Sequence, residues 1–286
     1  MSNIALSADS TCDLSSELKD EYNVVYYPYC IILGDKEYRD NVDIHPSDIY
    51  KAYHKDGSLP KTAAISVGEY LEHFKKLKES HDEVIHITLG HALSSACDNA
   101  KSAAEQLDGV YVVDSCNLST GTGQLVIRAG RMIKDGMDAK SIVSELEKIK
   151  EHVHVSFVLD TLDFMAAGGR CPTVAAKAAG MLKCKPLLNV DNSDGSLHMG
   201  KMYRGKLKKV LLKYIGDQLS QYDDVVPDDV FVTNSAELED DILEAVKAEV
   251  RKYVPFERVH ETVASCTISS HCGPRCFGIL FVTKWD

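Results

Sequence analysis

The alternation of strand-like and helix-like segments in the first half of the chain is the feature that most limits its fold. Short β-rich segments at 4–8, 84–88 and 110–114 each precede a segment that can form a helix. This order favours a parallel sheet, because parallel neighbours need a crossover long enough to hold a helix. Helices are predicted at 46–53, 67–79, 93–107, 121–134 and 138–152, and one long β-rich run at 24–33. The sequence therefore predicts an α/β fold with a parallel sheet.

The second half of the chain has a different pattern. Two strand-like segments, 186–190 and 197–202, flank the turn sequence Asn192-Ser193-Asp194-Gly195, which is typical of a β-hairpin. Further strands are predicted at 155–159, 230–233, 258–264 and 278–283, and helices at 173–181, 205–222 and 237–253. A hairpin combined with helices indicates an α+β domain. We therefore expect an N-terminal α/β domain at 1–153 and a C-terminal α+β domain at 154–286.

The overall charge argues against several classes of partner. The 286 residues include 43 Asp and Glu against 32 Lys and Arg, which gives a net charge of -11. An acidic chain repels nucleic acid and anionic lipid surfaces. Its apolar stretches are too short to cross a bilayer, and its first residues lack the pattern of a signal peptide. We expect a cytoplasmic protein that binds no nucleic acid and does not insert stably into a membrane.

The cysteines are dispersed and contain no CxxC pair. Nine are present, at positions 12, 30, 97, 116, 171, 184, 266, 272 and 276, and such a set is typical of reduced, small hydrophobic side chains. Cys272 and Cys276 lie close to His271, but a structural zinc site needs four ligands and usually a second close pair. We expect no metal site and no cofactor.

Small polar clusters occur where strands are expected to end. They contain Ser10, Thr62, Ser94 with Ser95, Arg170 after two glycines, and His271 before Cys272-Gly273-Pro274. Hydroxyls, a guanidinium and an imidazole are suited to holding an anionic head group. Together these clusters indicate binding more than catalysis.

Each cluster also has an ordinary structural explanation. Ser94 and Ser95 are expected at a helix start, where the helix dipole favours a carboxylate or phosphate, but serine is also a common N-cap. Arg170 could present a bidentate fork to an oxyanion, or it could be a solvated residue after a glycine C-cap. His271 is expected on a turn between two strands, where it could donate to an anion, act as a base, or do neither.

Catalytic signatures are weak. The sequence has no G-x-S-x-G elbow and no P-loop, and Gly121-Thr122-Gly123 lacks the third glycine of a dinucleotide fingerprint. We therefore expect no catalytic residues. A serine hydrolase or acyltransferase with Ser94 as nucleophile and His271 as base is an alternative, since such triads form in space and not in sequence. A lipid-sensing protein is a third possibility.

Taken in order, the clusters resemble the motifs of the DegV family of bacterial fatty-acid-binding proteins. The similarity runs through nearly the whole chain. It comprises Asp9 to Leu14, Thr62 to Ser66, Leu93 to Ala96, Asp114-Ser115, Gly168 to Arg170, Lys185-Pro186 and His271 to Pro274. Each motif is short, but the ordered set is specific.

The resemblance implies a two-domain protein that encloses one long-chain fatty acid between its lobes. By analogy, Thr62 and Ser94 hold the carboxylate, and Ser10, Ser95, Arg170 and His271 lie near the head group. The family's role implies an ATP-dependent fatty acid kinase as partner, which forms an acyl-phosphate on a carrier that is not itself an enzyme. An acyltransferase then uses the acyl-phosphate for phospholipid synthesis. Arg204 matches a basic family position that faces the kinase.

The sequence departs from the family pattern at several positions. Ala63-Ala64-Ile65 replaces Ser-Gln-Pro, and Ser95-Ala96 replaces Gly-Thr after Ser94. Gly90-His91 occurs where small hydroxyl residues are usual, and Arg275 replaces a glycine. These changes leave Thr62, Ser94 and His271 in place.

Overall fold

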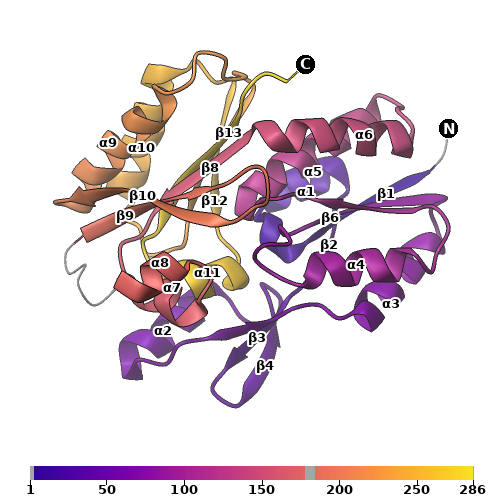
Figure 1. Ribbon diagram of the computed structural model, residues 1–286, viewed down its shortest axis with the longest axis horizontal. Helices are drawn as coiled ribbons and strands as arrows, with labels where there is room; N and C mark the ends of the chain where they lie inside the picture. Colours follow the sequence, from indigo (N-terminus) through magenta and orange to yellow (C-terminus); the bar gives the residue numbers. More distant parts are fainter. Residues whose placement is uncertain (1–2, 178–183, 286) are drawn as a thin grey trace.

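The computed structural model describes residues 3–177 and 184–285, which form three β-sheets and the helices that cover them (Figure 1). One sheet has four strands, one has six and one has three. Helices α7 (Asp163–Gly168), α8 (Pro172–Lys177) and α11 (Cys266–Cys272) gather in the middle of the molecule. They lie between the six-stranded sheet and the small sheet that contains β3 (Cys30–Leu33) and β4 (Lys36–Arg39) (Figure 1). The mixed α/β architecture predicted from the sequence is confirmed.

The four-stranded sheet is parallel throughout, in the order β2-β1-β6-β7. Its strands are β1 (Ile4–Asp9), β2 (Val25–Tyr27), β6 (Glu83–Thr88) and β7 (Val110–Asp114). The segments between these strands include α1 (Ser16–Tyr22), α3 (Val67–Lys78) and α4 (Ala96–Ala104), while α5 (Ser119–Lys134) and α6 (Ala139–Ile149) follow β7 and lead to the six-stranded sheet. The carboxyl ends of these parallel strands share one edge of the sheet, so the polar residues that follow them are brought together.

The β-rich run predicted at 24–33 forms two strands. It is divided at Pro28 and Tyr29 into β2 and β3 (Cys30–Leu33), which belong to different sheets. Proline has no N–H to donate to a sheet, so it separates the two strands. Strand β3 pairs antiparallel with β4 (Lys36–Arg39) and β5 (Lys61–Ala63), and the sequence did not predict this small sheet.

The six-stranded sheet is mixed, in the order β10-β9-β8-β13-β11-β12. Its strands are β8 (Val153–Val158), β9 (Cys184–Val190), β10 (Leu197–Arg204), β11 (Asp229–Asn234), β12 (Arg258–Val263) and β13 (Phe277–Val282). Strands β9 and β10 form the predicted antiparallel hairpin, and only β11 and β12 pair in parallel among these strands. Helices α9 (Leu207–Leu219) and α10 (Asp240–Tyr253) lie together on one side of this sheet (Figure 1).

The other helices are short. They are α2 (Pro46–Asp56), α7 (Asp163–Gly168), α8 (Pro172–Lys177) and α11 (Cys266–Cys272), with single 3-10 turns at η1 (Ser10–Cys12) and η2 (Lys150–His152). The helix predicted at 173–181 extends to residues outside the described part of the chain. No described helix is both long and apolar enough to cross a membrane.

The prediction of a turn around His271 was wrong, because His271 lies in the last turn of α11. Ser265 is the N-cap of this helix, and its hydroxyl accepts a hydrogen bond from the Ile268 N–H at 3.4 Å. Thr267, Ile268 and the two following serines have only moderate helix propensity, so the segment looked like the end of a strand. Caps supplied from distant residues stabilise the helix instead.

Two buried aspartates from the N-terminal half hold the start of α11. Asp13 Oδ1 accepts the Ser265 N–H at 2.9 Å, and Asp40 accepts the backbone N–H groups of Cys266 and Thr267 at 2.7 and 3.3 Å. Asp40 also accepts the hydroxyls of Ser10 and Thr267 at 2.9 and 2.7 Å. Carboxylates at a helix start are favoured by its unpaired N–H groups and its dipole. The N-terminal half therefore fixes the position of a C-terminal helix.

The hydrophobic core does not divide at residue 153. One cluster of buried side chains includes Leu6 and Ile87 of the parallel sheet together with Phe157 and Leu280 of the six-stranded sheet. A second cluster lies between the six-stranded sheet and α9 with α10, and includes Tyr214, Val246 and Phe281. The packing of these clusters does not mark a boundary at 153, so the domain boundary stays a prediction.

Replacing Asp40 tests the role of this helix cap. We expect Asp40→Ala to lower the free energy of unfolding by about 3 kcal/mol, because it leaves several buried donors without an acceptor. Chemical denaturation measures the change. Asp56→Ala is the control, since Asp56 is exposed and its side chain bonds only the nearby Ser58 within the described part of the chain. Equal effects from the two variants would contradict the assigned role of Asp40.

Candidate functional site

Four of the residues predicted to bind an anion line one chamber, which we call the hydroxyl-lined chamber. These residues are Thr62, Ser94, Arg170 and His271. They come from β5, the loop before α4, the segment after α7, and α11. The chamber contains about 530 Å³ of empty space, part of it open to solvent. The fold thus joins residues that are up to 209 positions apart.

Thr62 and His271 are in direct contact. Thr62 Oγ1 lies 3.0 Å from His271 Nε2, and β5 aligns Thr62 with Ile31 of β3. Nδ1 of the same imidazole is buried and has no hydrogen-bond partner among the described residues. The imidazole therefore interacts with the chamber through the Thr62 hydroxyl.

Ser94 is supported in a similar way by Tyr29, a residue that the sequence analysis did not single out. The Tyr29 hydroxyl donates to Ser94 Oγ at 3.3 Å, and the Ala96 N–H donates to the same oxygen at 3.2 Å. Tyr29 is 2% exposed and follows Pro28 at the break between β2 and β3. The only sequence signal for Tyr29 was its place beside this proline.

The two glycines before Arg170 have separate structural reasons. A Cβ on Gly168 would lie 2.2 Å from His271 Nδ1, so only glycine allows the imidazole to approach this closely. Gly169 ends α7 with a φ of +68°, in the left-handed region that glycine adopts without strain. The Gly-Gly pair therefore packs against His271 and turns the chain toward Arg170.

Arg170 is exposed at the edge of the chamber. Its Nε donates to the Leu93 carbonyl at 3.3 Å, and one terminal nitrogen donates to the Gly168 carbonyl at 2.7 Å. A guanidinium has five N–H groups, so it can bind both carbonyls and still present donors to an anion. Both explanations of Arg170, solvated side chain and anion ligand, are compatible with this placement.

His271 is held in its neutral form at neutral pH. Burial, and then the positive charge of Arg170, lower the pKa of His271 to about 4. Within the described residues, no hydrogen bond joins His271 to Ser94; its Nε2 contacts Thr62 instead. The nucleophile and base pair of the hydrolase alternative is therefore not assembled in this structure.

A second chamber continues from the first, and we call it the apolar chamber. The two share Leu118, Phe157, Ile268 and Cys272 in their walls. The apolar chamber contains about 330 Å³ of empty space and presents almost only apolar surface. Its remaining walls come from α5, strands β8, β11 and β13, and the loops on either side of α11, including Val155, Ala264, Cys276 and Leu280. A chamber that holds several polar side chains, joined to one with an almost wholly apolar surface, suits an amphipathic ligand.

Three other predicted residues lie outside the lining of these chambers. Ser10 is buried and bridges Asp40 and the Tyr29 N–H, at 2.9 and 3.2 Å. Ser95 is exposed and begins α4 without a side-chain cap bond. Arg204 is exposed at the end of β10, opposite Cys184. Ser10 thus supports the backbone that precedes the chamber, through Tyr29.

Apolar wall residues were not predicted individually from the sequence. The walls of the hydroxyl-lined chamber also contain the apolar residues Leu89, Leu93, Met165 and Leu197. Such residues share no motif, because each projects from a different element and meets the others only in the folded chain. His271, Cys272 and Cys276 do not form a cluster of potential metal ligands among the described residues.

Comparison with known proteins agrees with this architecture. A family model described as "Uncharacterised protein, DegV family" matches residues 3–284. A DegV domain-containing protein of Caldanaerobacter subterraneus is 30% identical over 287 residues, covering 99% of this chain and 100% of that protein. The match therefore extends over both halves of the chain.

Solved structures of similar proteins have the same fold. A DegV family protein from Thermus thermophilus, described for its fatty acid binding, has a TM-score of 0.89 at 26% identity, covering 99% of this chain and 100% of that one. DegV from Bacillus subtilis, described as a fatty acid binding protein, has a TM-score of 0.83 at 25% identity with the same coverage. A stearic acid-binding protein from Eubacterium ventriosum has a TM-score of 0.85 at 25% identity, covering 99% of both chains. The chain described here belongs to the DegV family.

Proposed function

We propose that this protein binds one long-chain fatty acid, with its carboxylate at Thr62 and Ser94 and its tail in the apolar chamber. The observation that carries the proposal is the pairing of each hydroxyl with a second polar side chain, at the mouth of an apolar interior. Related proteins described as fatty acid binding share the fold over nearly their whole length. The carboxylate gives orientation and the tail gives most of the affinity.

The direction of the hydrogen bonds supports a carboxylate ligand. Ser94 Oγ already accepts from Tyr29 and Ala96, so its own proton can be donated to a ligand oxygen. In the tautomer that carries its proton on Nε2, neutral His271 donates to Thr62 Oγ1 and leaves the Thr62 proton available in the same way. Two hydroxyls that donate into one chamber can hold an acceptor-only group such as a carboxylate.

The apolar chamber supports a long tail. Removing each CH₂ group from water contributes about 0.8 kcal/mol, so a tail of ~14 such groups contributes roughly 10 kcal/mol before the entropic costs of binding. Hydrogen bonds from two neutral hydroxyls add less than this. The apolar walls therefore select for a ligand with a long chain, and Thr62 and Ser94 select for its carboxylate head group.

We further propose that the bound acid is presented to an ATP-dependent fatty acid kinase, which forms an acyl-phosphate at the chamber mouth. Arg170 is exposed at the edge of this chamber, where its charge would stabilise the added phosphate. Exposed Arg204 is the proposed kinase-facing residue. An acyltransferase of phospholipid synthesis would then consume the acyl-phosphate, so this protein acts as a carrier and not as an enzyme.

Lipid extraction provides the first test. We expect protein purified without added lipid, then denatured and extracted, to release about one long-chain fatty acid per chain by mass spectrometry. A carrier retains its ligand intact, whereas a hydrolase would release products. Protein that is empty and also takes up no added oleate or palmitate would overturn the proposal.

Substitutions of the hydroxyls test the carboxylate site. We expect Thr62→Ala or Ser94→Ala to weaken fatty acid binding roughly ten- to hundredfold, because each removes one hydrogen bond to a charged group, worth about 1.5–3 kcal/mol. Tyr29→Phe should weaken fatty acid binding less, since it removes only the hydroxyl that donates to Ser94. Competition with a fluorescent fatty acid measures these affinities.

Ser102→Ala is the matched control for Ser94→Ala, because Ser102 lies on the exposed surface of α4. Its affinity should equal that of the unmodified protein. Circular dichroism confirms that each variant is folded. Unchanged binding in the folded Thr62→Ala, Ser94→Ala double variant would exclude these residues as the carboxylate site.

The charge state of His271 can be tested by NMR titration of the lipid-free protein, with His271→Gln used to assign the signal. We expect the ring to titrate with a pKa of about 4, below the usual 6.5. Arg170→Gln should raise this pKa, because it removes a positive charge that disfavours imidazolium, but burial should still hold it below 6.5. Between about pH 6.5 and pH 4, the unfolded chain binds a proton on this histidine more readily than the folded chain does. His271 therefore lowers the free energy of unfolding as the pH falls through this range. A midpoint near 6.5 in the unmodified protein would refute the neutral, buried assignment.

A further inference from the structure

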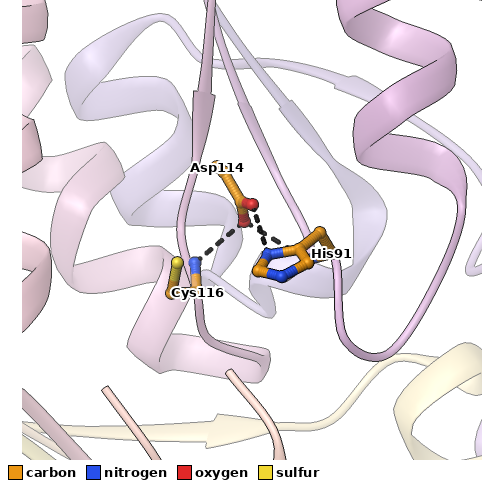
Figure 2. Close-up of side chains that lie close together, drawn as sticks. All are labelled: His91, Asp114 and Cys116. Carbon is orange, nitrogen blue, oxygen red and sulfur yellow. Dashed lines mark hydrogen bonds and ion pairs between the residues drawn. The ribbon is translucent and has the colours of Figure 1, made fainter. Parts of the chain in front are cut away.

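His91, Asp114 and Cys116 converge at the carboxyl edge of the parallel sheet (Figure 2). Strands β6 and β7 are neighbours, with Thr88 aligned to Asp114, so the loops that follow them meet. His91 lies in the loop after β6, and Cys116 lies two residues after the end of β7. None of the three side chains lines the hydroxyl-lined or apolar chamber. The cluster is therefore separate from the proposed fatty acid site.

The three side chains present one potential metal ligand atom each, and these atoms lie within 4.8 Å of one another. His91 Nδ1 is 2.7 Å from Asp114 Oδ2. With zinc bonds of about 2.0–2.3 Å, tetrahedral geometry separates nitrogen and oxygen ligands by about 3.3 Å and sulfur from either by about 3.6 Å. The His91 ring, which is 45% exposed, would have to move slightly away from Asp114, and the separations to the Cys116 sulfur, at most 4.8 Å, would have to shorten by no more than about 1.2 Å.

The backbone around the cluster is closely packed. Asp114 Oδ1 accepts the N–H groups of Cys116 at 3.0 Å and His91 at 3.3 Å, so one carboxylate oxygen fixes both loops while the other faces the imidazole. A Cβ on Gly90 would lie 2.8 Å from the Asn117 nitrogen, and one on Gly195 would lie 2.9 Å from the Cys116 carbonyl carbon. These contacts hold the backbone of the two loops together around Asp114.

The donor set selects a class of ion. Magnesium and calcium prefer oxygen ligands, whereas a thiolate with an imidazole and a carboxylate suits zinc. Three protein ligands and a solvent-exposed histidine leave a fourth position for water. The sequence shows no metal motif at these positions, because the ligands at 91, 114 and 116 have no recognised spacing and are brought together by the pairing of β6 with β7.

We propose that His91, Asp114 and Cys116 bind a divalent ion of the zinc class, with water as the fourth ligand and the Cys116 thiol proton released to solvent. This site lies beyond the proposed fatty acid function and does not depend on it. Its ligand atoms are Nδ1 of His91, a carboxylate oxygen of Asp114 and Sγ of Cys116.

Zinc titration of the purified full chain against a chromophoric chelator tests the proposal. We expect one zinc ion per chain. The affinity for zinc should be more than about 100-fold weaker in His91→Ala, Asp114→Asn and Cys116→Ser, since even residues that only hydrogen-bond to metal ligands change metal affinity by about 10–100-fold. Asp114→Asn retains an oxygen that can accept the Cys116 N–H, so it separates metal binding from loop structure. Cys30→Ser and His54→Ala, which lie outside the cluster, should bind zinc as the unmodified protein does.

Cobalt(II) gives a second readout that identifies the thiolate. We expect a sulfur-to-cobalt charge-transfer absorption in the unmodified protein and in Cys30→Ser, and its loss in Cys116→Ser. Should Cys116→Ser fail to fold, the exposed His91→Ala variant decides the question by zinc affinity. Absence of zinc uptake at micromolar free zinc, or equal uptake by the three cluster variants, would overturn the site whatever the lipid content of the protein.

Discussion

The placement of α11 depends on two buried carboxylates. Asp13 and Asp40 belong to the N-terminal half, yet they accept the first backbone N–H groups of a helix near the C-terminus. Burial raises the pKa of Asp13 to about 7 and also raises that of Asp40, so each carboxylate is costly to ionise without these donors. The hydrogen bonds offset this cost and hold His271 opposite Thr62.

The candidate site follows from that constraint. Once α11 is held in position, His271 contacts Thr62 and packs on Gly168, while Ile268 and Cys272 form walls shared by both chambers. The two hydroxyls are each paired with a buried polar side chain, and neither needs a neighbouring charge to donate a proton. Hydroxyl donors of this kind suit a single carboxylate joined to a large apolar tail, because the tail provides the affinity.

Sequence periodicity predicted the regular elements well and the irregular ones poorly. Helix α3 and strands β6 and β7 were confirmed within a residue or two, because their apolar residues repeat with a clear period. The division of 24–33 between two sheets and the helical state of His271 were missed. Both depend on partners far along the chain, namely β5 for β3 and the two aspartates for α11.

The sequence by itself determined the α/β architecture, the DegV motifs and the polar residues Thr62, Ser94, Arg170 and His271. These follow from local patterns of hydrophobicity, glycine and hydroxyl residues that can be recognised without coordinates. Only the tertiary structure revealed Tyr29 behind Ser94, the apolar walls, and the approach of His91 to Asp114 and Cys116. Strand pairing and helix capping bring these side chains together across long sequence separations, and no local pattern records which distant residues will meet.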